Sequence, residues 1–293
     1  MPPAPQCADT ARERGDPMHG TALNVRQFLL IEHPGPWPFD ALQAIRQDIH
    51  DLLVAATSTA GSRTLLIRRH GRATATPKRA WAVADVIGGR IRWGTWGDDS
   101  DLLDAHDALS EPTTSWSDEP VLLVCTHGRH DTCCAVRGRP VAAALAERHG
   151  DRVWECSHVG GDRFAPTVVV LPDGTYYGGL DDADAGDIID RHLDGTVTPE
   201  RLRGSSLFAP VAQAAAVAVH ENFGPGGPRD VTSANVETTD RGRWRVELRC
   251  TGRLPERVVV EVEARQSAPA LLTCRAVKPT SARTFEVTGL RAV

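Results

Sequence analysis

The sequence predicts an α/β protein, because apolar strands alternate with amphipathic helices through most of the chain. A second observation is the cysteine pattern: three of the seven cysteines, Cys125, Cys133 and Cys134, fall within ten residues. A third is the length of 293 residues, which suffices for two or three domains with separate cores. We therefore expect a central α/β domain with a cysteine site, flanked by an N-terminal α/β unit and a small C-terminal α+β segment.

Composition excludes several classes of function. The formal net charge is −5, which gives no basic footprint for nucleic acid. No stretch approaches the roughly 20 apolar residues that span a bilayer, and the N-terminus lacks the apolar core of a secretory signal, so we expect no membrane partner. We expect a cytoplasmic protein with reduced cysteines, which favours a metal or redox site over a disulfide framework.

The N-terminal part divides into two segments. Residues 1–21 mix Pro, Gly, Asp and Arg without periodicity and are expected to be a disordered leader. Residues 22–117 are expected to form the first α/β unit. Its predicted elements are a strand at 26–33, a helix at 39–57, a strand at 62–70, and two strands within 79–96 joined at the Gly88–Gly89 turn.

Residues 118–195 form the predicted central domain. Its continuous apolar strand at 120–125 is followed by a helix at 139–149, which has Pro140 in its first turn. Later strands are predicted at 152–156, 167–172 and 175–180, with a closing helix at 185–193. The full order is therefore β-α-β-β-β-α, which is the minimal thioredoxin fold. Pro166 directly precedes the third strand, where this fold places a cis proline, so we expect the Ala165–Pro166 bond to be cis.

Residues 196–293 are predicted to form the C-terminal α+β domain. A helix at 210–224 precedes four strands. We find no internal sequence repeat. The predicted strands lie at 233–240, 243–250, 256–264 and 268–277.

Four residues of the central domain carry the candidate chemistry. Cys125 and Cys134 form C-x8-C, and His158 and Asp162 form H-x3-D after a spacer of 23 residues. The first pair follows the first strand and the second pair follows the second strand. Neighbouring parallel strands lie about 4.8 Å apart, so both loops open at the same edge of the sheet. The sequence therefore predicts one site built from the two loops.

The stretch CTHGRHDTCCAVRGRPVAAAL, followed by WECSHVGGDRFAPTVVVLPDGTYYG, resembles the sucrase/ferredoxin-like family of thioredoxin-like ferredoxins. The resemblance is strongest over residues 121–178, and LLIEHPGPWPFDAL is similar to the start of bacterial members. It implies a [2Fe-2S] electron carrier with two Cys ligands and two His ligands in H-x3-H. Cys125, Cys134 and His158 match this pattern, whereas Asp162 stands in the place of the second histidine.

The fourth ligand stays open, because a carboxylate is a harder donor than imidazole. Asp162 and Cys156 are equal candidates, and Cys133 ranks third because two adjacent thiolates rarely reach one small site. Backbone N–H groups at Gly160 and Gly161 are candidate hydrogen-bond donors to the cluster. His127 is a candidate for a supporting role beside the cluster.

Other functions are possible on the same fold. A tetrahedral zinc site suits the same donors, although C-x8-C is wider than usual for zinc ribbons. A thiol oxidoreductase fits less well, since the chain has no C-x-x-C and a vicinal Cys133–Cys134 disulfide is strained. No motif suggests the paired carboxylates of a glycosidase. We expect a non-enzymatic electron carrier that exchanges electrons with a reductase or acceptor protein.

Overall fold

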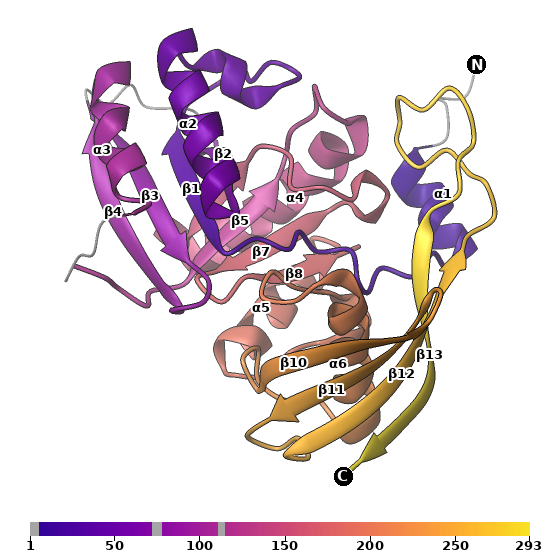
Figure 1. Cartoon of the computed structure of the whole chain (residues 1–293). Coiled ribbons are helices and arrows are strands. Elements are labelled where there is room, and N and C mark those ends of the chain that lie inside the picture. The colour runs from indigo at the N-terminus through magenta and orange to yellow at the C-terminus, as the bar shows by residue number, and fades with distance from the viewer. Residues whose placement is uncertain (1–5, 72–77, 111–114) are drawn as a thin grey trace. The chain divides into compact units, whose positions relative to one another are not determined.

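The computed structural model describes residues 6–71, 78–110 and 115–293, which divide into two compact units. Unit 2 comprises residues 25–159 and 166–174. Unit 1 comprises the described residues up to 24, together with 160–165 and 175–293. Figure 1 labels the elements of both. The chain thus changes units within the expected central domain, at 159/160, 165/166 and 174/175.

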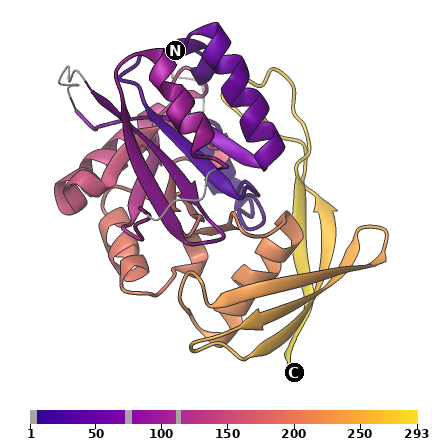
Figure 2. The ribbon, with the colours of Figure 1, turned by 60° about the vertical axis from the view of Figure 1, so that its left-hand side comes forward.

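The first half of unit 2 is a β-α-β-β-β-α run. Its strands β1 (Gln27–Glu32) and β2 (Ser62–Arg68) are parallel and joined through α2 (Gln47–Ala60). Strand β3 (Arg79–Asp85) pairs antiparallel with β1 and with β4 (Arg90–Trp96). Helix α2 and the short α3 (Leu102–Asp107) pack against this sheet (Figure 2). Alternate strand residues meet the two helices in a common core that includes Leu29, Ile31, Leu53, Trp81, Val83 and Leu102.

The expected helix at 39–57 is divided in the structure. A 3-10 turn at Ala41–Ala44 precedes α2, and Asp40 caps it by accepting a hydrogen bond from the N–H of Leu42. Ile45 is extended and Arg46 is also non-helical, so these two residues separate the 3-10 turn from α2. The apolar periodicity of the sequence therefore continues across an interruption of the helix.

The second half of unit 2 repeats the first β-α-β-β part of this run. Strands β5 (Val121–Cys125) and β6 (Val153–Cys156) are parallel and joined through α4 (Thr132–His149), and β7 (Thr167–Leu171) pairs antiparallel with β5. Every residue of β5, β6 and β7 is buried, as expected for central strands. Along the chain, β8 (Thr175–Gly178) and α5 (Ala185–Leu193) complete the predicted β-α-β-β-β-α order of a thioredoxin-like domain.

Helix α4 begins before the predicted start at 139. Asp131 caps it by accepting a hydrogen bond from the N–H of Cys133 at 2.9 Å, and Pro140 lies inside the helix. The Pro140 signal for a first turn was therefore wrong by about two helical turns. Cys133 and Cys134 consequently lie in the first turn of α4.

Unit 2 thus contains a repeated topology that sequence comparison within the chain does not reveal. The two halves join where β2 pairs antiparallel with β6, through Ile67↔Cys156 and Arg68↔Glu155. The strand order in this unit is β4-β3-β1-β2-β6-β5-β7. In each half the first two strands are parallel, β1 with β2 and β5 with β6. The third strand, β3 or β7, then pairs antiparallel with the first strand of its half.

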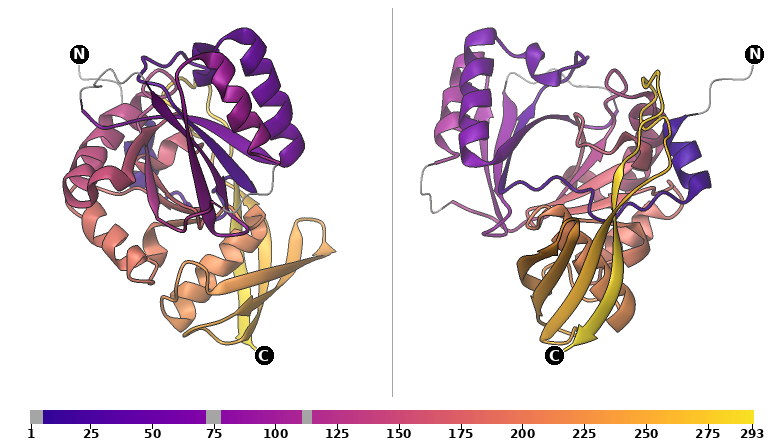
Figure 3. Two further views of the ribbon diagram at one scale, coloured as in Figure 1. Left: turned by 90° about the vertical axis from the view of Figure 1, so that its left-hand side faces the viewer. Right: turned by 45° about the vertical axis from the view of Figure 1, so that its right-hand side comes forward.

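Unit 1 contains a second, antiparallel sheet packed on one helix. The sheet order is β10-β11-β12-β13, and its core residues meet α6 (Pro210–Phe223). Figure 3 shows the ribbon of this part of the chain in orange and yellow. A short pair of strands, β8 and β9 (Leu202–Ser205), also belongs to this unit. The sheet strands are β10 (Val231–Asp240), β11 (Arg243–Cys250), β12 (Arg257–Gln266) and β13 (Arg283–Ala292).

The fourth strand of this sheet is β13 and not the predicted segment 268–277. That segment contains Pro269, which has no N–H to donate to a ladder, and only one isolated bridge, Ala270↔Thr280, forms near it. The chain at β13 instead pairs with β12 along its whole length. The prediction of a strand at 268–277 was wrong.

The segment expected to be a disordered leader contains the helix α1 (Cys7–Arg14). Gly15 ends this helix in the left-handed conformation with φ of 65°. Arg12 pairs with Asp181 at 3.2 Å, and Arg163 lies 3.4 Å from Asp16, which tie the segment to other parts of unit 1. The described part of the leader is therefore ordered, and it makes long-range contacts that composition does not reveal.

The cis peptide bonds of the described residues precede Pro36 and Pro172, so the prediction of a cis bond at Ala165–Pro166 was wrong.

Among the described helices, none combines the length and the apolar character that crossing a bilayer requires.

Candidate metal centre

Three predicted ligands come together at one end of the sheet in unit 2. Cys125 ends β5, Cys134 lies in the first turn of α4, and His158 follows β6. The Nδ1 atom of His158 is 4.0 Å from Sγ of Cys125 and 3.8 Å from Sγ of Cys134. Their ligand atoms all lie within 4.8 Å of one another. The expectation that both loops open at the same edge is therefore met for these three residues.

The environment favours a thiolate at Cys125. A hydrogen bond with the Cys134 thiol is the largest influence that lowers the pKa of Cys125 well below its ordinary value; burial opposes it, and His158 assists. Cys134 also lies at the N-terminus of an 18-residue helix, where the helix dipole favours negative charge. Both cysteines are only 2% exposed. The pair is thus a protected thiol–thiolate donor set.

Glycine allows α4 to approach the end of β5. A Cβ atom on Gly138 would stand 2.1 Å from the carbonyl oxygen of Cys125. A Cβ on Gly128, in the loop between β5 and α4, would stand 2.7 Å from Cβ of Ala135. The distance between the two cysteines therefore depends on the absence of a side chain at Gly138.

The side chain of His127 is held in place by a hydrogen bond and an aromatic contact. Its Nε2 donates a hydrogen bond to the carbonyl oxygen of Pro38 at 2.8 Å, and its ring meets Trp37 edge-on at 5.7 Å. Burial lowers the pKa of His127 below its ordinary value, which favours the neutral ring. Its Nδ1 is buried without a hydrogen-bond partner in the described part of the chain. The supporting role of His127 stays a prediction.

His130, which is not among the ligands predicted from sequence, lies against His158. Its ring stacks on His158 with centroids 3.8 Å apart and an interplanar angle of 15°. Phe39 stacks on His130 at 4.8 Å with an angle of 14°. The available signal was the short spacing of His127 and His130 in one loop, but it does not say which ring turns toward His158.

The other predicted ligands have different surroundings. Cys156 is fully buried; burial, followed by the charge on Cys125, raises the pKa of its thiol well above its ordinary value. The group of close ligand atoms around Cys125, Cys134 and His158 does not include Cys156 among the described residues. A protonated thiol is a poor metal ligand. Cys133, also buried, donates its backbone N–H to Asp131.

Asp162, Gly160 and Gly161 belong to unit 1. Gly160 and Gly161 have φ of 82° and 76°, in the left-handed region that favours glycine. The guanidinium of Arg203, itself fully buried, donates from Nη1 to the carbonyl oxygen of Gly160 at 3.0 Å. Asp162 begins a single 3-10 turn, Asp162–Phe164. As partners of a cluster, these three residues stay predictions.

The buried carboxylate of Glu155 links the ends of neighbouring strands next to the site. Nothing in the sequence alone indicates this role. Glu155 accepts hydrogen bonds from Arg68 at 2.7 and 2.9 Å, from Thr126 at 2.8 Å, and pairs with Nδ1 of His70 at 2.9 Å. Burial alone would raise the pKa of Glu155, but Arg68, His70 and Thr126 together lower it. Because Thr126 follows Cys125, this network joins the ligand loop to β2.

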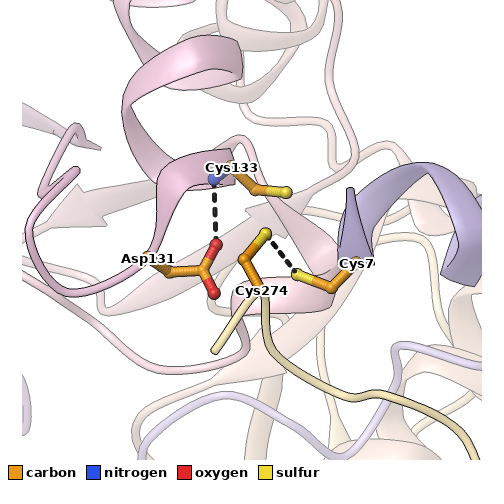
Figure 4. Close-up of side chains that lie close together, drawn as sticks. All are labelled: Cys7, Asp131, Cys133 and Cys274. Carbon is orange, nitrogen blue, oxygen red and sulfur yellow. Dashed lines mark hydrogen bonds between the residues drawn. The ribbon is translucent and has the colours of Figure 1, made fainter. Parts of the chain in front are cut away.

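Unit 1 contains a second pair of thiols. The Sγ atoms of Cys7 and Cys274 are 3.5 Å apart, and a dashed line joins them in Figure 4. The same figure draws the bond between Asp131 and the N–H of Cys133 in unit 2. Cys7 is thus a buried helical residue, not the mobile one that a disordered leader implies.

Comparisons with known proteins find one matching family and one similar solved structure. The model of the family described as sucrase/ferredoxin-like matches residues 18–204. Among solved structures, the chain is similar to a variant of the thioredoxin-like [2Fe-2S] ferredoxin from Aquifex aeolicus, with 26% identity and a TM-score of 0.25, over 29% of this chain and 96% of that one. No curated protein matches the sequence.

Proposed function

Because this chain belongs to the sucrase/ferredoxin-like family, we propose that Cys125, Cys134 and His158 bind a [2Fe-2S] cluster and that the protein carries single electrons. The observation that carries the proposal is the convergence of two buried thiols and one imidazole at one sheet edge. A [2Fe-2S] cluster takes thiolate ligands, and imidazoles replace a pair of them in some centres.

The residues present fit such a group. The lowered pKa of Cys125 supplies a thiolate without a strong external base. Imidazole ligation leaves less negative charge than thiolate and supports a higher reduction potential than in an all-cysteine ferredoxin. The bound cluster would supply the one-electron chemistry, while the chain's residues hold it and limit access of water.

Electron exchange with a partner protein is proposed to occur on the histidine side of the site. The two cysteines are 2% exposed, whereas His158 is partly exposed and the nearby Phe39 is 54% exposed. Electron transfer falls off with distance, so a reductase or acceptor would approach over the histidine and Phe39. We propose the cytoplasm as the compartment, because thiolate ligands are kept reduced there.

The first test is purification without oxygen. We expect visible absorption bands that bleach with dithionite, together with about two irons and two inorganic sulfides per chain. Cys125→Ala and Cys134→Ala should each remove the bands, because either change deletes a thiolate donor. Cys250→Ala, at a buried thiol in unit 1, is the matched control and should keep them. A colourless wild-type protein would overturn the proposal.

A zinc site is the second candidate, because one observation favours it. A tetrahedral zinc ion, with bonds of about 2.3 Å to sulfur and about 2.0–2.1 Å to nitrogen, brings sulfur and nitrogen ligands to ~3.6 Å. The observed 3.8 and 4.0 Å between Nδ1 of His158 and the two Sγ atoms are close to this value. Stoichiometric zinc without iron in the purified chain would support this candidate instead.

A further inference from the structure

The ligand set of the proposed cluster is incomplete with three residues. Two irons need two donors each, and the thiol pair serves one of them. His158 leaves one position to fill. The residue in the family position, Asp162, offers a carboxylate, which is a hard donor that suits iron–sulfur chemistry poorly.

A second imidazole already lies against the first. His130 and His158 stack with centroids 3.8 Å apart, and their ring nitrogens lie within 4.8 Å of each other. His130 does not join the close group formed by His158 with the two thiols. His130 thus extends the donor set beyond the group of three, on the imidazole side, while His158 contacts both the thiols and His130.

The loop holds His130 in this place. Its backbone N–H donates to the carbonyl oxygen of His127 at 3.1 Å, and the next residue, Asp131, donates to the same oxygen before it caps α4. Phe39 covers the other face of the His130 ring. The imidazole is therefore oriented by a turn, a helix cap and an aromatic neighbour, all within unit 2.

We propose that His130 is the fourth ligand of the cluster, so that His130 and His158 form the histidine pair and Asp162 does not ligate. The inference rests on the proposed [2Fe-2S] function and names a donor that the family spacing does not. It assigns the pair to two different loops, one after β5 and one after β6, in place of a single H-x3-H loop.

The test is pulsed EPR of the dithionite-reduced full chain, which counts nitrogen atoms bound to iron. We expect two strongly coupled ¹⁴N nuclei in the wild type. His130→Ala should lose one of them and lower the iron content by about half or more, since one iron loses a ligand. His130→Cys should restore the iron content through a thiolate, while still showing one coupled nitrogen.

Two controls accompany these variants. His106→Ala removes a partly exposed histidine of the same unit, and Asp162→Ala removes the competing carboxylate. Both should retain two coupled nitrogens. Far-UV circular dichroism checks that every variant is folded.

The outcomes separate the two proposals. A wild-type chain without iron and sulfide overturns the cluster and this inference together. A cluster with one coupled nitrogen in the wild type, or with both couplings intact in His130→Ala, overturns this inference and leaves the cluster in place. Loss of a coupled nitrogen in His130→Ala with iron restored in His130→Cys supports it.

Discussion

His220 shows how one buried residue makes the stability of unit 1 depend on pH. It lies on α6 at 4% exposure, and its Nδ1 accepts a hydrogen bond from the N–H of Gly226 at 3.1 Å, which requires a neutral ring. Burial lowers the pKa of His220 to about 4, although Asp230 acts in the opposite direction. Between pH 4 and pH 6.5, the His220 ring is therefore mostly neutral in the folded chain and mostly charged in the unfolded chain.

The sign of the effect follows from linkage. His220 binds a proton near pH 6.5 in the unfolded chain but only near pH 4 in the folded chain. Its contribution to the free energy of unfolding is therefore complete above pH 6.5 and is lost as the pH falls toward 4. The loss amounts to about 3 kcal/mol over this window. Urea denaturation midpoints at pH 7 and pH 5 should show a steeper fall for the wild type than for His220→Gln. Equal falls would contradict the argument, and His106→Gln is the control.

The candidate ligand residues were predictable to different degrees. Cys125 and His158 could be placed from sequence because strand ends define an edge. His130 could not, because its ring orientation depends on the turn at His127 and on stacking with Phe39 from a distant loop. Glu155 was hidden for a similar reason, since Arg68 reaches it only through the β2–β6 pairing.

At the scale of an element, helix α4 determines how the two cysteines meet. Its first turn carries Cys134, and its position is limited by contact between Gly138 and the carbonyl oxygen of Cys125. The sequence indicated a helix here, but Pro140 misplaced its start. The cap at Asp131 was the better signal, because its side chain accepts the N–H of Cys133.

Gly138→Ala should displace α4 from β5, because the new Cβ would stand 2.1 Å from a backbone oxygen that cannot move aside. We expect at least a ~1 kcal/mol loss of stability, in the range of overpacked cores, and a lower cluster content. Thermal unfolding and iron analysis measure both. Arg139→Ala, at the adjacent exposed position, should change neither. A Gly138→Ala protein with wild-type iron would show that helix approach does not control the site.

At the scale of the whole molecule, the repeated topology raises the question of a second centre. In both halves, the residue after the first strand donates its N–H to the neighbouring strand: His33 to Ile67 at 2.8 Å, and Thr126 to Cys156 at 3.2 Å. This equivalence places Glu32 in the position of Cys125 and, two residues past Ile67, Arg69 in the position of His158.

The first half has charged residues at the positions that are equivalent to two candidate ligands. The Glu32 carboxylate accepts the N–H of Ala80 at 2.7 Å, and the Arg69 guanidinium lies 3.5 Å over the Trp154 ring. A carboxylate and a cation in these places do not bind an iron–sulfur cluster. The topology is repeated, but the candidate ligands lie only in the half with Cys125.

This asymmetry predicts one cluster per chain. The wild type should contain about two irons, and the double variant Cys125→Ala/Cys134→Ala should contain essentially none, because the first half offers no thiolate. If the first half also held a cluster, about four irons would be present and about half would survive the double substitution. Iron and sulfide analysis on protein of known concentration distinguishes these results. Residual iron at half the wild-type content in the double variant would show that the first half also binds iron despite Glu32 and Arg69.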